Sequence, residues 1–145
     1  MRLQIQTTSS ITIINDCYNA NPASTANALD CLAQIATAQP GRLVFICGWM
    51  AELGQKSNEL HSRLGRSIPA SGVKLLLTIG PFAEITAEAA KVCAKNGLEM
   101  HVFENISELC NNLEEFIQPD DIVLVKGSRI AKLEKAVEKL KELFA

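Results

Sequence analysis

ITIINDCYNANP, residues 11–22, is an apolar run that passes directly into small polar side chains. The apolar part is nearly continuous, which is typical of a strand buried on both faces of a parallel sheet. Asn21 followed by Pro22 is typical of a helix N-terminus, with the amide as cap and proline in the first turn. A strand-to-helix connection needs only a few residues, and glycine or serine would normally serve. The carboxylate, amides and phenol in this connection therefore indicate a functional site.

Further apolar runs alternate with helical patterns along the rest of the chain. Buried strands are expected at residues 12–15, 43–47, 75–79, 100–103 and 122–125. Residues 3–6 are expected to pair antiparallel with the first of these as an edge strand.

The helical patterns have inward-facing apolar stripes and recognisable ends. After Asn21, a second helix start is predicted at Asn105, with Glu108 three residues later. The other two stripes are Phe82, Ile85, Ala89 and Val92, with Lys91 and Lys95 in the last turn and Gly97 beyond, and Ile130, Leu133, Val137, Leu140 and Phe144.

Strand and helix alternate at a spacing that implies right-handed crossovers. We therefore predict an α/β fold: a three-layer, Rossmann-like domain with a mainly parallel sheet of about six strands, one antiparallel edge strand, and helices on both faces. Residues 1–145 are expected to form a single domain. In such sheets, ligands bind outside the carboxyl ends of the strands, where the strand order reverses.

Composition narrows the class of protein. The chain has 145 residues, of which 48% are hydrophobic, and a formal net charge of -2 without a basic stripe. These values exclude a disordered chain and give no sign of nucleic-acid binding. Five cysteines without a C-x-x-C pair are interpreted as small buried residues, so we expect a cytoplasmic protein. No apolar stretch suggests a membrane span, and the early first strand suggests a domain of a longer polypeptide.

The polar stretch after the first strand has two interpretations. Asp16 either accepts hydrogen bonds from a vicinal diol such as a ribose, or caps a turn or helix. Asn19 and Asn21 also suit turn formation and capping, and Tyr18 could simply pack its ring.

Residues 126–129, KGSR, follow the last predicted strand. A lysine at a strand end, a glycine and a hydroxyl where a helix begins together suit a phosphate or carboxylate. The alternative is a lysine that extends to solvent beside an ordinary serine cap.

Residues 48–57 contain two glycines followed by a lysine and a serine, as a P-loop does. The P-loop pattern needs four residues between its glycines and lysine directly after the second. Here five residues separate Gly48 from Gly54, and Gln55 precedes Lys56. The sequence therefore predicts no autonomous triphosphate site.

His61 and His101 are the only histidines in the sequence. His101 lies within a predicted strand and is expected to be structural. His61 lies one turn into the helix predicted beyond the ELG of residues 52–54, so it either reaches the ligand edge or is a partly exposed helical histidine.

Three motifs resemble the C-terminal domain of the Mur ligases, in the same order and over essentially the whole chain. They are residues 16–22 (DCYNANP), 48–54 (GWMAELG) with His61 after it, and 125–129 (VKGSR). The chain departs from the usual family residues, which are acids and a serine in the first motif and an aspartate in the second, at Asn15, Cys17 and Trp49.

The resemblance implies part of an ATP-dependent amide ligase of peptidoglycan precursor synthesis. In the family, ATP phosphorylates the terminal carboxylate of UDP-N-acetylmuramoyl-tripeptide, and the amine of D-alanyl-D-alanine attacks the acyl phosphate. The P-loop, the Mg²⁺ ligands and the UDP-binding region are expected in two upstream domains outside this chain.

The resemblance also implies roles for particular residues. Those expected to contact ATP are Asp16, Tyr18, Asn19 and Asn21. Those expected to face the dipeptide carboxylate or the reacting phosphate are Lys126, Ser128 and Arg129, with Glu52 and His61 as further candidates. Replacing Asp16 by alanine is expected to raise the KM for ATP and leave the fold intact. The isolated chain is expected neither to hydrolyse ATP nor to ligate.

Two other classes of protein share this architecture. A phosphoacceptor receiver domain needs an aspartate at the end of its third strand, where this chain has residues 78–80, Thr-Ile-Gly. A stand-alone nucleotide-binding module would bind ATP tightly without catalysing a reaction.

Overall fold

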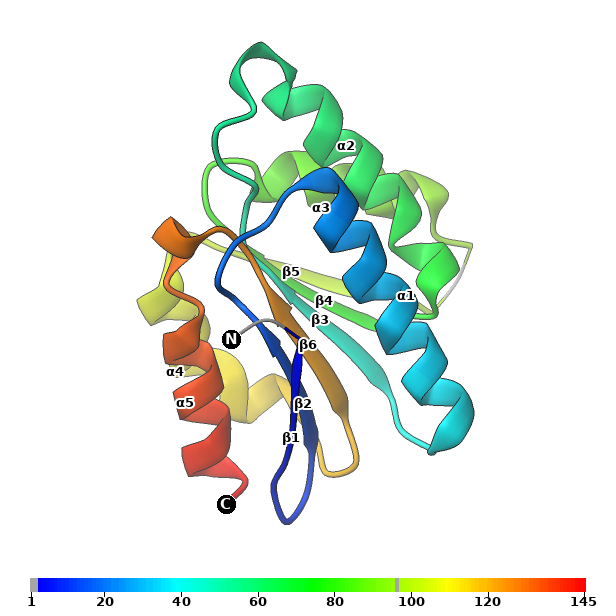
Figure 1. Cartoon of the computed structure of the whole chain (residues 1–145), viewed down its shortest axis with the longest axis vertical. Helices are drawn as coiled ribbons and strands as arrows, with labels where there is room; N and C mark the ends of the chain where they lie inside the picture. Colours follow the sequence, from blue (N-terminus) through cyan, green and yellow to red (C-terminus); the bar gives the residue numbers. More distant parts are fainter. Residues whose placement is uncertain (1–2, 96) are drawn as a thin grey trace.

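The computed structural model describes residues 3–95 and 97–145. Its six strands form one sheet in the order β1-β2-β6-β3-β4-β5 (Figure 1). β1 pairs antiparallel with β2, and every other pair is parallel, as predicted. The strands are β1 (Gln4–Thr7), β2 (Thr12–Asp16), β3 (Leu43–Cys47), β4 (Leu75–Ile79), β5 (Glu99–Phe103) and β6 (Ile122–Lys126).

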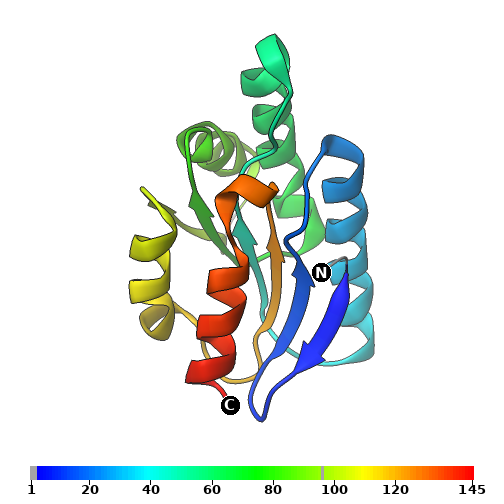
Figure 2. The same ribbon diagram turned by 60° about the vertical axis from the view of Figure 1, so that its left-hand side comes forward.

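Five α-helices cover the two faces of the sheet. They are α1 (Pro22–Ala38), α2 (Ser57–Ser67), α3 (Ala83–Cys93), α4 (Ile106–Phe116) and α5 (Glu134–Leu143). Figures 1 and 2 show α1, α2 and α3 on one face and α4 and α5 on the other. Side chains alternate along each strand, so neighbouring residues such as Ile13 and Ile14 belong to opposite apolar cores. The three layers confirm the predicted fold class.

Two of the predicted helix starts have the expected caps. The Asn21 Oδ1 atom accepts a hydrogen bond from the Ser24 backbone N–H at 2.8 Å, and the Ser24 hydroxyl accepts one from the Asn21 N–H at 3.1 Å. The Asn105 Oδ1 atom accepts from the Glu108 N–H at 2.9 Å. Each cap satisfies backbone donors that a helix start leaves free.

Two predicted helical stripes were partly wrong. Val92 is 81% exposed, and Lys95 lies beyond the end of α3 at Cys93. Ile130 is 67% exposed because it belongs to a short 3₁₀ turn, Arg129–Ala131, rather than to the last helix. Lys132 then adopts a left-handed conformation (φ 56°), which breaks the chain direction before α5 begins.

The sheet topology places the ends of its central strands side by side. Asp16 at the end of β2 is in register with Lys126 at the end of β6, and Lys126 is in register with Cys47 at the end of β3. Because β6 lies between β2 and β3, the chain crosses it on the way from one to the other. This is the point where an open sheet of this kind forms a crevice. Within the described residues, no helix is long and apolar enough to cross a membrane.

Candidate functional site

Asp16 and Lys126 form a buried ion pair at the carboxyl end of the sheet. The Lys126 Nζ atom lies 2.7 Å from Asp16 Oδ2, and the side chains are 2% and 7% exposed, respectively. Nζ also donates to the Asn19 carbonyl oxygen at 3.0 Å, and Asp16 Oδ1 accepts from the Leu3 N–H at 3.3 Å. The carboxylate and the ammonium therefore neutralise each other, and backbone groups complete their coordination.

A cavity of about 370 Å³ lies directly beside this pair. Its lining includes three of the side chains expected to contact ATP and one expected to face the second substrate: Asp16, Asn19, Asn21 and Lys126. Leu3, Ser24 and Asn27 complete the lining. The structure thus brings together residues that are more than a hundred positions apart in sequence.

The two asparagines also have the local roles that were considered from the sequence. Asn21 caps α1, as described above, and the Asn19 Oδ1 atom accepts from the Ala20 N–H at 2.8 Å. These bonds fix the side-chain amides in the turn between β2 and α1. Capping and a position on the cavity wall are therefore compatible.

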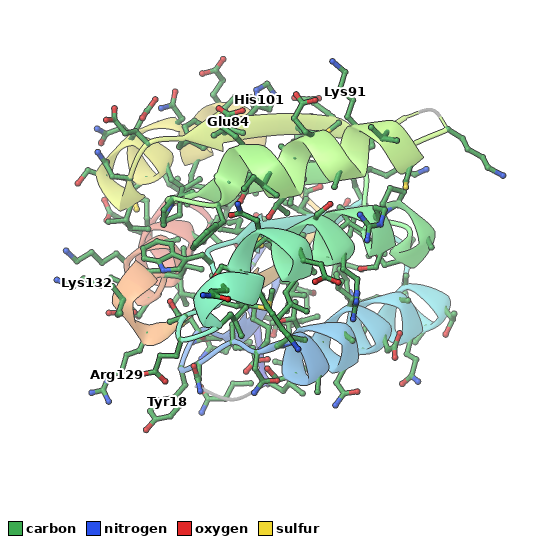
Figure 3. The ribbon with its side chains drawn as sticks, turned by 90° about the horizontal axis from the view of Figure 1, so that it is seen from above. Tyr18, Glu84, Lys91, His101, Arg129 and Lys132 are labelled. Atoms are coloured by element: carbon green, nitrogen blue, oxygen red, sulfur yellow. The ribbon has the colours of Figure 1, made fainter. Side chains whose placement is uncertain are left out.

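Tyr18 and Arg129 lie together at the outer edge of this region. The guanidinium carbon of Arg129 is 5.6 Å from the centre of the Tyr18 ring, a distance typical of a cation–π contact. Both side chains are exposed, and Figure 3 shows them at one corner of the molecule, with Lys132 nearby on the same side. Arg129 is thus a cation with access to solvent, unlike Lys126.

Ser128 lies differently from its predicted position. The residue is 1% exposed, its N–H donates to the Trp49 carbonyl oxygen at 2.7 Å, and its buried hydroxyl has no hydrogen-bond partner. The turn that follows is a three-residue 3₁₀ turn, so no α-helix begins here to supply the predicted anion site. The backbone N–H of Ser128 therefore connects this turn to the loop after β3, and the Ser128 side chain does not face solvent.

Glu52 and His61 lie in different environments, one exposed and the other buried. Glu52 is exposed in the loop between β3 and α2 and has a left-handed backbone (φ 63°). His61 is 0% exposed, so it is neither a partly exposed histidine nor able to touch a ligand in this arrangement. Its ring nitrogens bond to backbone groups of Met50 and Ser57, and it stacks on Phe82 with ring centres 4.4 Å apart.

A second and larger cavity of about 860 Å³ lies along the same edge of the sheet. The ends of β3, β4 and β5 and the Arg129–Ala131 turn supply its walls, which include Trp49, Gly80, Phe103, Glu104, Ile130 and Lys132. The indole of Trp49 lies so close to Gly80 (φ 101°) that a side chain there would overlap it. Glu52 lines neither cavity.

This second cavity was not predicted from the sequence. Glu104 and Asn105, which follow β5 directly, line it and were not among the predicted site residues. A polar pair at the end of a strand was the available signal. His101 on β5 is partly exposed, with its Nε2 atom 2.6 Å from a Glu99 carboxylate oxygen, and its ring packs at a tilt against Phe116.

Two of the five cysteines, Cys17 and Cys47, are the small buried residues that their spacing predicts. Burial raises the pKa of the Cys17 thiol to about 11 and that of Cys47 to about 12, so neither is a nucleophile at neutral pH. Cys31 and Cys110 are partly buried, but Cys93 is exposed, contrary to the prediction. Among the residues that the structure describes, no group of three or more His, Cys, Asp or Glu side chains could hold a metal ion.

The family described as "Mur ligase, glutamate ligase domain" matches residues 1–129. The chain therefore belongs to the Mur ligase family. This finding confirms the resemblance drawn from the three motifs.

Among curated proteins, the chain is similar to UDP-N-acetylmuramoyl-tripeptide--D-alanyl-D-alanine ligases. It is 32% identical over 132 residues to the enzyme of Escherichia coli, which covers 90% of this chain and 27% of that protein. It is 35% identical over 127 residues to the enzyme of Treponema pallidum, which covers 87% of this chain and 27% of that protein. The chain therefore spans roughly a quarter of the length of these relatives.

Solved structures give the same likeness. A crystal structure of MurF from Acinetobacter baumannii superposes with a TM-score of 0.81 at 30% identity, covering 97% of this chain and 30% of that one. MurF from Thermotoga maritima in complex with ADP has a TM-score of 0.77 at 22% identity, covering 99% of this chain and 31% of that one. The latter likeness shows the fold alone.

Proposed function

We propose that this chain is the C-terminal domain of an ATP-dependent amide ligase that adds D-alanyl-D-alanine to UDP-N-acetylmuramoyl-tripeptide. The buried Asp16–Lys126 pair beside an open cavity, at the point where the strand order reverses, is the observation that carries the proposal. The names of the relatives support this choice of substrates. The process in which this ligase would act is peptidoglycan precursor synthesis.

In this proposal, Asp16, Asn19 and Asn21 form one wall of a nucleotide cleft. A carboxylate and amides beside a strand end suit the hydroxyl groups of a ribose. Tyr18 and Arg129 lie at the outer edge, where the exposed guanidinium could meet a phosphate or a carboxylate. The buried Ser128 and His61 support the wall instead of touching the ligands.

The charges around the cavity indicate that this wall is half of a site. Asp16 cancels the charge of Lys126, so the pair offers a triphosphate no net positive charge. The P-loop, the Mg²⁺ site and the UDP-binding region would belong to the two upstream domains of the parent polypeptide.

Closure of this domain over the nucleotide would serve the chemistry in two ways. ATP supplies the phosphoryl group that activates the terminal carboxylate of the tripeptide. The closed wall would exclude water from the resulting acyl phosphate, and it would hold the incoming amine at attacking distance. The cytoplasmic location stays a prediction.

Phosphate release by the parent polypeptide tests the proposal. We expect release that requires ATP, UDP-N-acetylmuramoyl-tripeptide and D-alanyl-D-alanine together, with a ligated product of the summed mass less water. The matched control is the isolated 145-residue chain, for which we expect no release.

Phosphate release that does not depend on D-alanyl-D-alanine would contradict the substrate assignment. Tight ATP binding by the isolated chain, measured by calorimetry, would instead favour a stand-alone nucleotide-binding module.

A further inference from the structure

A buried histidine holds the loop that carries Trp49. Residues 48–56 connect β3 to α2, and Trp49 is the only tryptophan in the sequence. His61, one turn into α2, contacts this loop, and its side chain is fully buried. Its Nε2 atom is 3.0 Å from the Met50 backbone nitrogen, and its Nδ1 atom is 2.7 Å from the Ser57 carbonyl oxygen.

These two bonds define the protonation state of the ring. The Met50 N–H can only donate, so the Nε2 atom of His61 must accept and carries no proton. The Ser57 carbonyl can only accept, so Nδ1 carries the single ring proton and donates it. Both bonds together therefore require the neutral imidazole. A second ring proton, on Nε2, would point at the Met50 N–H, and two donors cannot form a hydrogen bond with each other.

The bond from Met50 is one of three consecutive attachments of the loop. The Gly48 N–H donates to the Lys126 carbonyl oxygen at 2.9 Å, and the Trp49 carbonyl oxygen accepts from the Ser128 N–H at 2.7 Å. Met50 is 2% exposed, so water cannot replace His61 as the acceptor of its N–H. Losing that acceptor would leave a buried donor unpaired, at a cost that favours opening of the loop.

We propose that His61 is a positioning residue for the edge of the candidate site: its neutral ring fixes the loop that places Trp49 against Gly80, and a second proton releases that loop. Trp49 walls the larger cavity, so release would change its shape. The catalytic consequence rests on the proposed function, whereas the release itself does not.

The surroundings of His61 set the direction of the pH dependence. Burial lowers the pKa of His61, and the hydrogen bond with the Ser57 carbonyl offsets part of this effect. The charged groups on the packed elements are all exposed: Glu52 and Lys56 on the loop, Glu59, Arg63 and Arg66 on α2, Asp30 on α1, and Glu84, Glu88 and Lys91 on α3. The neutral ring thus stabilises the fold fully above the ordinary histidine pKa of 6.5, and this stability is lost as the pH falls from there towards the lower pKa of the folded chain.

Fluorescence of Trp49 tests the release on the 145-residue chain. We expect its quenching constant with acrylamide to rise severalfold as the pH is lowered from 8 to 5, before far-ultraviolet circular dichroism shows loss of the helices. The variant His61→Gln keeps an acceptor that does not titrate, so its quenching should stay at the high-pH value throughout. His101→Gln, which changes the other histidine, is the matched control and should titrate as the unmodified chain does.

Quenching that does not change with pH, or a change with pH that persists in His61→Gln, would overturn the proposal. In the parent polypeptide, we expect the acid limb of the pH profile of kcat/KM to move to lower pH in His61→Gln. If quenching responds as expected but no D-alanyl-D-alanine-dependent activity is found at any pH, the proposed function fails and the role of His61 in the loop stands.

Discussion

Asp16 and Lys126 show how a site residue can be a structural residue at the same time. Their ion pair is almost inaccessible to water, and each partner has one further backbone hydrogen bond. Removing one charge of a buried pair leaves the other without compensation, which typically costs more than the pair contributes as a whole. The sequence-based expectation that Asp16→Ala leaves the fold intact is therefore replaced by a prediction of instability.

We expect Asp16→Ala to lower the free energy of unfolding by about 3–5 kcal/mol, because it leaves the buried Lys126 ammonium without a partner of opposite charge. Urea denaturation at pH 7 measures this change. The double variant Asp16→Ala with Lys126→Met removes both charges and should regain most of the loss. Equal stability of the single and double variants would show that the pair is not coupled. A KM for ATP measured on the single variant alone would mix binding with stability.

At the residue scale, the sequence predicted which side chains lie near one another at the edge of the sheet, but not which of them are buried. Asp16, Asn19, Asn21 and Lys126 were predicted to converge because parallel strands end at one edge, and they line one cavity. The burial of Ser128 and His61 depends on how the loop after β3 folds over them, and that packing has no local sequence pattern. His61 was considered a candidate ligand contact from its position along the chain, but it is a buried support.

At the scale of elements, the strands were the most predictable part of the fold. Each predicted strand lies within one residue of its observed bounds at either end. Burial on both faces explains the continuous apolar runs of β2, β3, β4 and β6. The prediction of a buried strand at residues 100–103 was wrong in its burial, because β5 is an edge strand in which only Phe103 is buried. The last helix was less predictable, because the apolar periodicity from Ile130 onward continued through a 3₁₀ turn and the left-handed Lys132. Periodicity alone does not reveal such a break.

Helix α2 packs against α3 at Gly65. A Cβ at this position would overlap the Thr86 carbonyl oxygen and crowd the Ala89 side chain. We expect Gly65→Ala to lower the free energy of unfolding by about 1–2 kcal/mol, since an overpacking cost of about 3 kcal/mol outweighs the roughly 1 kcal/mol that alanine gains in helix propensity. Thermal unfolding measures the change.

The matched control for this variant is Asn58→Ala, which is exposed in the first turn of the same helix and should change the stability little. A Gly65→Ala chain as stable as the unmodified one would mean that α2 and α3 can move apart at little cost. The loop held by His61 on α2 would then be less firmly placed than the structure indicates.

At the scale of the whole molecule, the functional residues gather at one end of a three-layer domain. The opposite, amino end carries a different ion pair, in which the Arg42 guanidinium binds both carboxylate oxygens of Asp121 at 3.0 and 2.7 Å and anchors the chain just before β3 and β6. Each end of the sheet is therefore fixed by an ion pair. Topology could be predicted from the alternation of strands and helices, but the second cavity depends on side chains from three strand ends and a turn.

Hydrogen exchange of the parent polypeptide, with and without a non-hydrolysable ATP analogue, tests the central claim most directly. We predict slower exchange on nucleotide binding in residues 17–21 and 127–132, which lie at the carboxyl end of the sheet, and no change in residues 39–42, 72–74 and 118–121 at the amino end. Protection confined to the amino-end connections, or none anywhere in this chain while the nucleotide is bound, would contradict the account.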